Sequence, residues 1–222
     1  MTTQQQPFDT IITAATDHLS SIDPVMRTTI EQIGPCTLKP DPDIFNALVD
    51  AIISQQISVK AADAILKRVR AAMPDGVITP EVLAGYDADT LRTLGVSAQK
   101  ARYILSLVEH VQGGQLVLEE LPTLGDEEVI QRLTMVKGIG RWTAEMVLIF
   151  VLGRPDVLPV DDLGFLEGVR AAYNLPERPK RAEMLARGEL WRPYRTFATW
   201  YMWAWRHYVQ RNDQEKKHAV SL

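Results

Sequence analysis

Apolar residues recur at helical spacing along almost the whole chain, and this constrains the fold more than any other feature. Alternating patterns typical of strands are scarce. Proline and glycine interrupt the pattern at 34–42, 74–80, 113–125, 153–159 and 174–179, which divides the chain into roughly ten helices. The 222 residues, 46% of them hydrophobic, suffice for one large domain or for two small ones that share a core. The sequence therefore predicts an all-α protein.

Short polar side chains mark where several of these helices should begin. Their oxygens can accept hydrogen bonds from the N–H groups of a first helical turn, which have no partner inside the helix. Where proline follows such a residue, it favours the first position of the helix. The predicted starts are Asp9, Asp23, Asp41, Ser58, Ser97 and Asp126.

Composition excludes several classes of protein. The longest apolar run, from 146 to 152, is much shorter than the roughly 20 residues of a membrane-spanning helix, and the first residues lack the pattern of a signal peptide. We therefore expect a cytoplasmic protein with no membrane partner. Cys36 is the only cysteine, so the chain can hold neither a disulfide framework nor an iron–sulfur cluster bound by four of its own thiolates. The four histidines lack metal-ligand spacing, which argues against a zinc site.

The formal net charge of −4 hides an asymmetry along the chain. Residues 1–134 contain 10 Lys and Arg against 18 Asp and Glu, whereas residues 135–222 contain 14 against 10. A polyanionic partner such as DNA is attracted by positive charge. Binding of such a partner would therefore have to use the second part of the chain.

The segment VKGIG at 136–140 joins two predicted helices, one through Val129 and Leu133 and one from 141 to 152. Gly138 and Gly140 permit positive φ and carry no Cβ, so consecutive backbone N–H groups and the N-terminus of the second helix can point at one anion. A phosphate is the obvious candidate. The alternative is a tight turn in which the glycines only relieve crowding.

Four segments together resemble one family. LTMVKGIGRWTAEMVLIF, at 133–150, resembles the helix–hairpin–helix of the DNA glycosylase superfamily, and RPDVLPVDDLGF, at 154–165, is similar to its Gly/Pro-rich loop and aspartate. IISQQISVKAA, at 52–62, resembles the segment that places a wedge side chain into duplex DNA. WRPYRTFATWYMW, at 191–203, is similar to the C-terminal helix of the DNA-3-methyladenine glycosylase II branch. The segments span about 150 residues in the expected order.

This resemblance implies a two-lobed, all-α helix–hairpin–helix glycosylase fold without an N-terminal β domain. We expect a six-helix bundle at 46–154 that contains the hairpin. The second lobe would combine 1–45 with 155–222, and the base pocket would lie between the two lobes.

The resemblance also implies the reaction. Relatives that cut the DNA strand carry a lysine nucleophile where this chain has Trp142, and an indole cannot form a Schiff base. We therefore expect a monofunctional glycosylase in base excision repair. It would flip alkylated bases of the 3-methyladenine or 7-methylguanine type out of double-stranded DNA and hydrolyse the bond between base and sugar with water. The alternatives are a non-enzymatic DNA-binding module and a strand-cutting glycosylase for oxidised bases; the missing lysine and cluster cysteines argue against the second.

Two neighbouring carboxylates are the catalytic candidates. The family pattern aligns Asp162 with the catalytic aspartate and leaves Asp161 as a supporting acid. A carboxylate there would stabilise the oxocarbenium-like charge that develops on the sugar as the base leaves. Both residues follow Pro159, so either could instead be only a helix N-cap.

Further roles follow from the same alignment. Trp142, Trp203 and Met146 would line the base pocket, where electron-rich aromatic walls favour an alkylated base that carries positive charge. Met146 stands where some relatives have a tyrosine. Gln56 would be the wedge that fills the space of the flipped base, although Gln55 and Gln56 could also be exposed amides on a helix surface.

The hairpin is implied to bind the DNA backbone. Its predicted phosphate-binding residues are Lys137, Gly138, Ile139, Gly140 and Arg141. The resemblance implies a structural Na⁺ or K⁺ on the backbone carbonyls of Thr134, Val136 and Ile139, and no cofactor for catalysis. We expect a monomeric protein associated with the nucleoid, whose affinity for DNA falls as salt rises.

Overall fold

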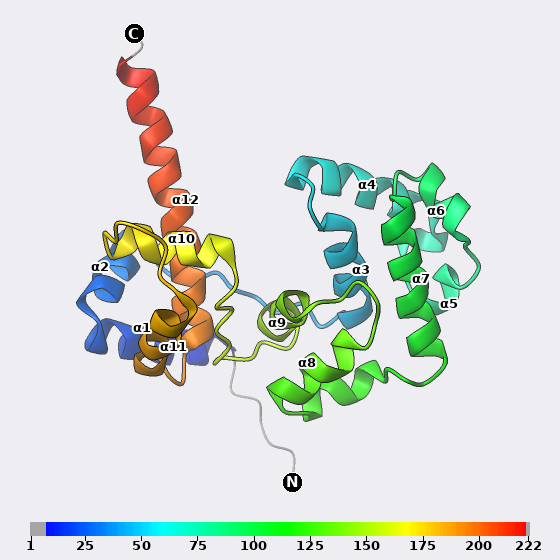
Figure 1. The fold of residues 1–222 in the computed structure, drawn as a ribbon, viewed down its shortest axis with the longest axis horizontal. Coiled ribbons are helices and arrows are strands. Elements are labelled where there is room, and N and C mark those ends of the chain that lie inside the picture. Colours follow the sequence, from blue (N-terminus) through cyan, green and yellow to red (C-terminus); the bar gives the residue numbers. More distant parts are fainter. Residues whose placement is uncertain (1–7, 221–222) are drawn as a thin grey trace. The chain divides into compact units, whose positions relative to one another are not determined.

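The computed structural model describes residues 8–220, with side chains described as far as residue 215. Within this range it contains twelve α-helices, two short 3-10 helices and no strand, so the prediction of an all-α fold is confirmed (Figure 1). No helix among the described residues combines the length and the apolar character needed to cross a membrane. The contacts form two compact units. We call residues 40–152 the central unit, and the segments up to residue 39 and from residue 153 the flanking unit.

The central unit consists of short helices that bury one apolar face each. Its core includes Leu48, Val49, Ile52 and Ile53 of one helix, all fully buried. The unit contains, in chain order, α3 (Ile44–Ser54), α4 (Val59–Ala72), η1 (Pro74–Gly76), α5 (Pro80–Leu83), α6 (Ala88–Thr93), α7 (Ala98–Gln112), η2 (Leu118–Thr123), α8 (Asp126–Thr134) and α9 (Arg141–Phe150). The helices α8 and α9 pack against each other, and α3 contacts α4, α7 and α9.

Helix caps were predicted correctly at some positions and wrongly at others. Ser58 and Ser97 cap α4 and α7 as expected, accepting bonds from the N–H groups of Ala61 and Lys100 at 3.3 and 3.4 Å. The helix expected after Asp41 begins later, because Asp43 caps α3 and Asp41 instead accepts a bond from the Asp43 N–H. The N-cap of α8 is Gly125, not the adjacent aspartate, which forms part of the first turn.

The flanking unit contains α1 (Phe8–Ile22), α2 (Pro24–Ile33), α10 (Leu163–Ala172), α11 (Arg181–Leu190) and α12 (Arg195–Val220). The long helix α12 packs against α10, α2 and α1 (Figure 1). Gly168 of α10 faces the backbone of α12 so closely that a Cβ at this position would overlap the carbonyl group of Met202. The absence of a side chain at Gly168 therefore sets the short distance between these two helices.

A buried carboxylate connects three helices of the flanking unit. Asp23 caps α2 as predicted, with Oδ1 2.9 Å from the Val25 N–H nitrogen. Its Oδ2 accepts bonds from the Tyr173 hydroxyl at 2.5 Å and from the Trp191 indole at 3.3 Å. Burial and the neighbouring carboxylate raise the pKa of Tyr173. With the Met26 N–H at 3.3 Å from Oδ1, four donors satisfy the buried carboxylate of Asp23, as burial requires.

Candidate functional site

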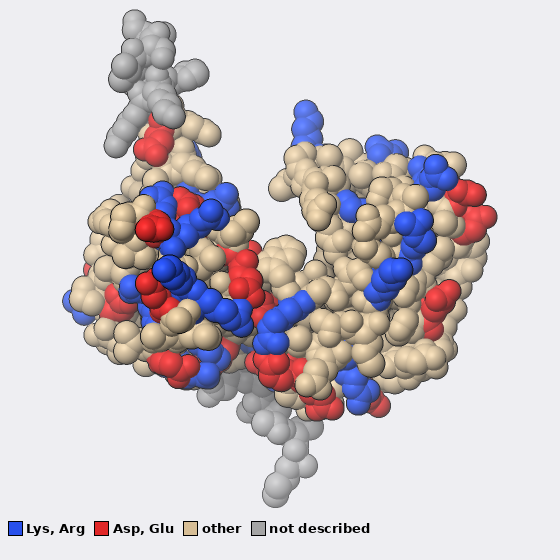
Figure 2. All heavy atoms as spheres, viewed as in Figure 1, with Lys and Arg blue, Asp and Glu red and all other residues tan. Residues whose placement is uncertain are grey.

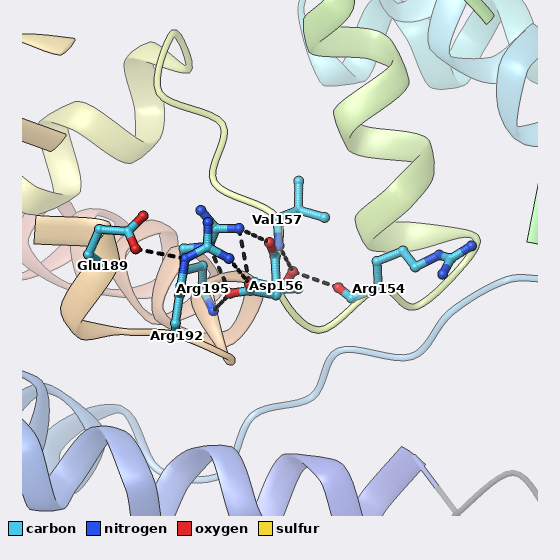
Figure 3. A network of polar contacts seen from close by, with 7 residues as sticks. Arg154, Asp156, Val157, Glu189, Arg192 and Arg195 are labelled. Carbon is cyan, nitrogen blue, oxygen red and sulfur yellow. Dashed lines mark hydrogen bonds and ion pairs between the residues drawn. The ribbon is translucent and has the colours of Figure 1, made fainter. Parts of the chain in front are cut away.

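The loop that leads to the two candidate carboxylates is fastened to the start of α12. Asp156 accepts hydrogen bonds from Arg192 at 2.7 Å and from Arg195 at 2.7 and 3.0 Å (Figure 3). The Nη2 of Arg195 also donates to the backbone carbonyl of Asp156 at 2.7 Å. Glu189 pairs with Arg192 at 3.0 Å. Arg195 is only 15% exposed, so its ion pair is screened less by water than a surface pair.

Thr196 adds a second attachment of the same loop. Its hydroxyl donates to the carbonyl of Arg154 at 2.6 Å and accepts from the Val157 N–H at 3.0 Å. Its own N–H donates to the carbonyl of Pro155 at 3.0 Å. The loop is thus held by main-chain and side-chain bonds, and the residues that follow it start from a fixed point on α12.

Asp162 lies at the N-terminus of α10 and is half-buried. Its Oδ1 accepts the N–H of Phe165 at 2.5 Å, so Asp162 is indeed a helix N-cap. The same oxygen accepts the indole Nε1–H of Trp203 at 2.8 Å. The structure therefore brings together two of the predicted site residues, but Trp203 contributes a hydrogen bond to the carboxylate, which the sequence did not reveal.

Gly164 belongs to the surroundings of this carboxylate, although sequence reasoning gave it no role. A Cβ at this position would lie 3.2 Å from Oδ1 of Asp162, 3.1 Å from Nη1 of Arg206 and 3.5 Å from Cδ1 of Trp203. The missing side chain makes room for the aspartate, the indole and the guanidinium together. The glycine in the segment DDLGF was the available signal.

Asp161 has different surroundings from its neighbour. Its side chain is 63% exposed, and its Oδ2 pairs with Nη1 of Arg181 at 2.7 Å. Capping of α10 is done by Asp162, not by Asp161. The two carboxylates therefore differ in partner and exposure, and only Asp162 is hydrogen-bonded to an aromatic side chain of the predicted pocket.

Trp142 and Met146 lie on α9 in the central unit. They are four residues apart and therefore share one face of the helix. Trp142 is 44% exposed, which is unusual for so large an apolar side chain, and Met146 is half-buried. These two residues belong to the central unit, whereas Asp162 and Trp203 belong to the flanking unit. A pocket that combines all four stays a prediction.

The hairpin between α8 and α9 uses its two glycines differently. Gly138 has φ +95°, and a Cβ there would overlap the ring of Tyr103. Gly140 has φ −94°, so it does not use the positive φ that glycine permits. Nothing lies within 4 Å of where a Cβ of Gly140 would be. Gly138 is thus required by the fold, whereas neither crowding nor backbone conformation requires the glycine at 140.

The amide groups of the hairpin are not all directed outward. The N–H of Ile139 donates to the carbonyl of Val136 at 3.1 Å, and the Ile139 side chain is buried. Ile139 therefore does not supply the outward-pointing N–H that was expected of it, because the turn uses this donor internally. The N-cap of α9 is Gly140, which offers the first turn no side-chain acceptor. An anion at this end of the helix would satisfy such N–H groups.

Arg141 and Lys137 differ in their partners. Arg141 forms a two-bond ion pair with Glu127 of α8 and a further contact with Glu145 of α9 at 3.2 Å. The hydrogen bonds from Arg141 lower the pKa of Glu127. Lys137 is exposed. To bind a phosphate, Arg141 would therefore have to give up its ion pair with Glu127. The sequence pattern does not show the free energy that this exchange costs.

The carbonyl groups predicted to hold a cation belong to the end of α8 and to the hairpin. Carbonyls in the last turn of a helix lack partners inside it, and hard cations prefer oxygen ligands. The carbonyl of Val136 accepts the Ile139 N–H, but a carbonyl oxygen has a second lone pair for a cation. The oxygens of Thr134, Val136 and Ile139 are thus chemically suited to Na⁺ or K⁺.

Gln56 lies in the turn between α3 and α4, not on a helix surface, so the alternative of exposed helix amides is wrong for this residue. It is exposed, and its φ is +56°, in the left-handed region. Gln55 is the C-cap of α3 and is half-buried, with its Nε2 donating to the carbonyl of Gly138 at 2.9 Å. The structure therefore joins the predicted wedge turn to the hairpin within the central unit.

Charge on the viewed face is mixed. Figure 2 shows Lys and Arg side chains distributed over both units, with Asp and Glu among them. Several of the basic groups are paired, as Arg141, Arg170 and Arg181 illustrate. Part of the positive charge after residue 135 is thus paired with neighbouring acids.

Comparisons with known proteins relate the chain to a family and to individual relatives. Residues 49–193 match the family model described as HhH-GPD superfamily base excision DNA repair protein. The chain is 37% identical over 205 residues to DNA-3-methyladenine glycosylase 1 of Schizosaccharomyces pombe, and the match covers 90% of each protein.

Two solved structures have the same fold. A 3-methyladenine DNA glycosylase of Schizosaccharomyces pombe in complex with abasic DNA gives a TM-score of 0.76 at 37% identity, covering 86% of this chain and 95% of that one. A DNA-3-methyladenine glycosidase of Bacillus halodurans gives a TM-score of 0.79 at 38% identity, covering 86% and 88%.

Proposed function

Because the chain belongs to the HhH-GPD superfamily of base excision DNA repair proteins, we propose that it is a monofunctional DNA glycosylase for alkylated purines. Its substrate is double-stranded DNA that carries bases of the 3-methyladenine or 7-methylguanine type. Its products are the released base and an abasic site in an uncut strand. The observation that carries this proposal is the half-buried Asp162, oriented by Phe165 and Trp203 at the N-terminus of α10.

Asp162 is the catalytic residue in this proposal. As the bond between base and sugar breaks, positive charge develops on the sugar, and a nearby carboxylate lowers the energy of that transition state. The bonds from Phe165 and Trp203 fix the carboxylate in one orientation before the reaction, so no energy is needed to reorganise it. The base leaves with both electrons of the broken bond, and water then adds to the sugar carbon and releases one proton to the solvent. Alkylated purines already carry positive charge and leave readily, so the proposal includes no general acid.

The absence of strand cleavage follows from Trp142. This residue occupies the position where strand-cutting relatives would need a lysine amine, and an indole has no nucleophilic nitrogen for a Schiff base. Its ring is 44% exposed and offers an electron-rich face to a cationic base, a role that the resemblance also implies for Trp203. Met146, on the same face of α9 as Trp142, adds a polarisable apolar surface.

DNA binding is assigned to the hairpin. Lys137, the backbone around Gly138 and Gly140, and the N-terminus of α9 would contact phosphates of one strand. A monovalent cation on the carbonyls of Thr134, Val136 and Ile139 would add positive charge next to that phosphate. We propose no cofactor for catalysis and a monomeric protein.

The purified protein should release alkylated purines from duplex DNA that has been treated with a methylating agent. Free base is measured by chromatography, and the remaining strand is examined for cleavage before and after alkali. Duplexes with one defined lesion each then establish the lesion range. Binding to DNA without any release would favour the non-enzymatic module, and strand cleavage without alkali would contradict the monofunctional assignment.

Gly140→Ser tests the hairpin without disturbing the fold. Serine is at least as good an N-cap as glycine, its φ of −94° suits any residue, and no protein atom occupies the space. We expect the melting temperature to stay the same or rise slightly. The affinity for duplex DNA should fall about tenfold, which corresponds to ~1.4 kcal/mol, because the new side chain stands where a phosphate approaches. Fluorescence anisotropy with labelled duplex measures this affinity.

The chain offers a matched control at Gly125. This glycine is the N-cap of α8, with φ −71° and nothing within 4 Å of a Cβ. Gly125→Ser therefore makes the same chemical change at an equivalent position of the neighbouring helix. It should leave DNA affinity unchanged, and an equal loss in both variants would contradict the role of Gly140.

Trp203→Phe separates the two roles of this tryptophan. Phenylalanine keeps an aromatic face but lacks the N–H that donates to Asp162. A hydrogen bond to a charged group contributes about 1.5–3 kcal/mol, so we expect the single-turnover rate of base release to fall at least about tenfold. Affinity for DNA should change little. An unchanged rate would show that Trp203 acts only as a wall.

A further inference from the structure

Two segments of the central unit that are distant in sequence are joined by one side chain. The Nε2 of Gln55 donates to the carbonyl oxygen of Gly138 at 2.9 Å, across 83 positions of the chain. We propose that Gln55 is a positioning residue that fixes the Gln56 turn relative to the hairpin. Binding of a DNA strand by the hairpin is then coupled to displacement of a base by Gln56. This inference rests on the proposed function.

The turn needs such support because of its backbone. Gln56 has φ +56°, a conformation that costs a residue with a side chain roughly 1 kcal/mol or more and persists only where the surroundings impose it. Lys100 of α7 provides one restraint, since its Nζ donates to the carbonyl of Ile53 at 2.7 Å. Burial lowers the pKa of Lys100. Gln55 provides the second restraint, directly next to the strained residue.

The hairpin offers Gln55 a well-defined acceptor. Gly138 has φ +95°, and the ring of Tyr103 packs against the position that a Cβ would occupy. The hydroxyl of Tyr103 is held in turn by Nε2 of Gln99 at 2.5 Å. The direction of the Gly138 carbonyl is therefore fixed by α7 as well as by the hairpin itself.

A groove lies beside this connection, with a volume of about 250 Å³. It is lined by Gln55, Gln56, Ile57, Ser97, Gln99, Lys100 and Tyr103. Gln55 and Lys100, whose side chains restrain the turn, thus both line this groove. The two adjacent glutamines have separate tasks, because the amide of Gln55 is bonded to the hairpin whereas Gln56 is exposed.

A double-mutant cycle tests the coupling. Gln55→Met keeps the length of the side chain but removes the donor, and Gln56→Ala removes the wedge. Single-turnover release of 7-methylguanine from a duplex with one such base is measured for the wild type, both single variants and the double variant. We expect each single substitution to lower the rate about tenfold. In the Gln55→Met background, Gln56→Ala should lower it less than about twofold, because the wedge is already displaced.

A matched control uses another amide of the central unit. Gln112 donates through Nε2 to the carbonyl of Pro80 at 3.4 Å, and it does not line the groove. Gln112→Met should leave the tenfold effect of Gln56→Ala intact. Affinity for undamaged duplex should stay within about twofold in Gln55→Met and Gln112→Met, since Tyr103 still shapes the hairpin.

Amide hydrogen exchange of the DNA-free protein gives a readout that does not depend on catalysis. In Gln55→Met we expect faster exchange at 56–58 and unchanged exchange at 138–143. Unchanged exchange in the turn, or independent and multiplicative losses in the cycle, would overturn the inference even if the wild type releases alkylated bases. A wild-type protein that releases none overturns the proposed function, and the role of Gln55 with it.

Discussion

Asp162→Asn is expected to lower the rate of alkylated-purine release by a factor of about 10² to 10³ or more, the range found when one electrostatic contact to a transition state is removed. Asparagine has nearly the same shape, and its Oδ1 can still accept from Phe165 and Trp203. It is also as good an N-cap as aspartate. The substitution therefore removes the negative charge and little else. Single-turnover release measures the loss, and binding to an abasic-site duplex should change little.

Asp161→Asn is the natural control for that experiment. It breaks an exposed ion pair with Arg181, and such pairs contribute on the order of 0–1 kcal/mol. We expect nearly full activity. Loss of activity in Asp161→Asn with retention in Asp162→Asn would reverse the assignment of the two carboxylates, and full activity in both would refute the carboxylate mechanism.

Gly168→Ala should strongly destabilise the flanking unit. The added methyl group would overlap the main chain of Met202, which cannot rotate away as a side chain can. Overpacking of this kind costs about 1–3 kcal/mol and sometimes more, against the ~0.5–1 kcal/mol that alanine gains over glycine inside a helix. We expect the melting temperature to fall by roughly 5–10 °C. Differential scanning calorimetry measures the shift.

The same substitution in α11 provides the comparison. A Cβ at Gly188 would meet a terminal methyl group of Leu158, a flexible side chain that can adopt another rotamer. Gly188→Ala should therefore cost much less than Gly168→Ala. Because α10 carries Asp162 and α12 carries Trp203, Gly168→Ala should also weaken base release below the melting temperature. Equal stability of the two variants would show that the backbone contact does not set the distance between α10 and α12.

Much of the fold follows from local signals. Helical periodicity predicts an all-α chain because each helix must bury one apolar face. Ser58, Ser97 and Asp23 mark helix starts correctly because capping is a short-range interaction. Errors arise where neighbouring residues compete for the N-cap position of one helix. Asp43 caps α3 in place of Asp41, and Gly125 caps α8 in place of the next aspartate.

The candidate site was predicted less completely because its interactions are long-range. The family pattern points to Asp162 and Trp203, but not to the bond between them, which spans 41 positions. It assigns a phosphate contact to Ile139, whose N–H the turn uses internally. It gives no role to Gln55 or Gly164, because neither type of residue is unusual in a helix or a turn. Partners that fold together from distant segments leave no periodic signal in one sequence.

Arg141 forms ion pairs with Glu127 of α8 and Glu145 of α9. These pairs affect how a protein with a negative net charge can bind a polyanion. The hairpin presents less positive charge to DNA than its residue types suggest. Besides the exposed Lys137, its contribution would come from amide dipoles at the N-terminus of α9, which act at short range on a backbone of matching contour. A chain with a net charge of −4 would then bind most genomic DNA only weakly. It would bind tightly only where the conformation of the DNA backbone matches the hairpin.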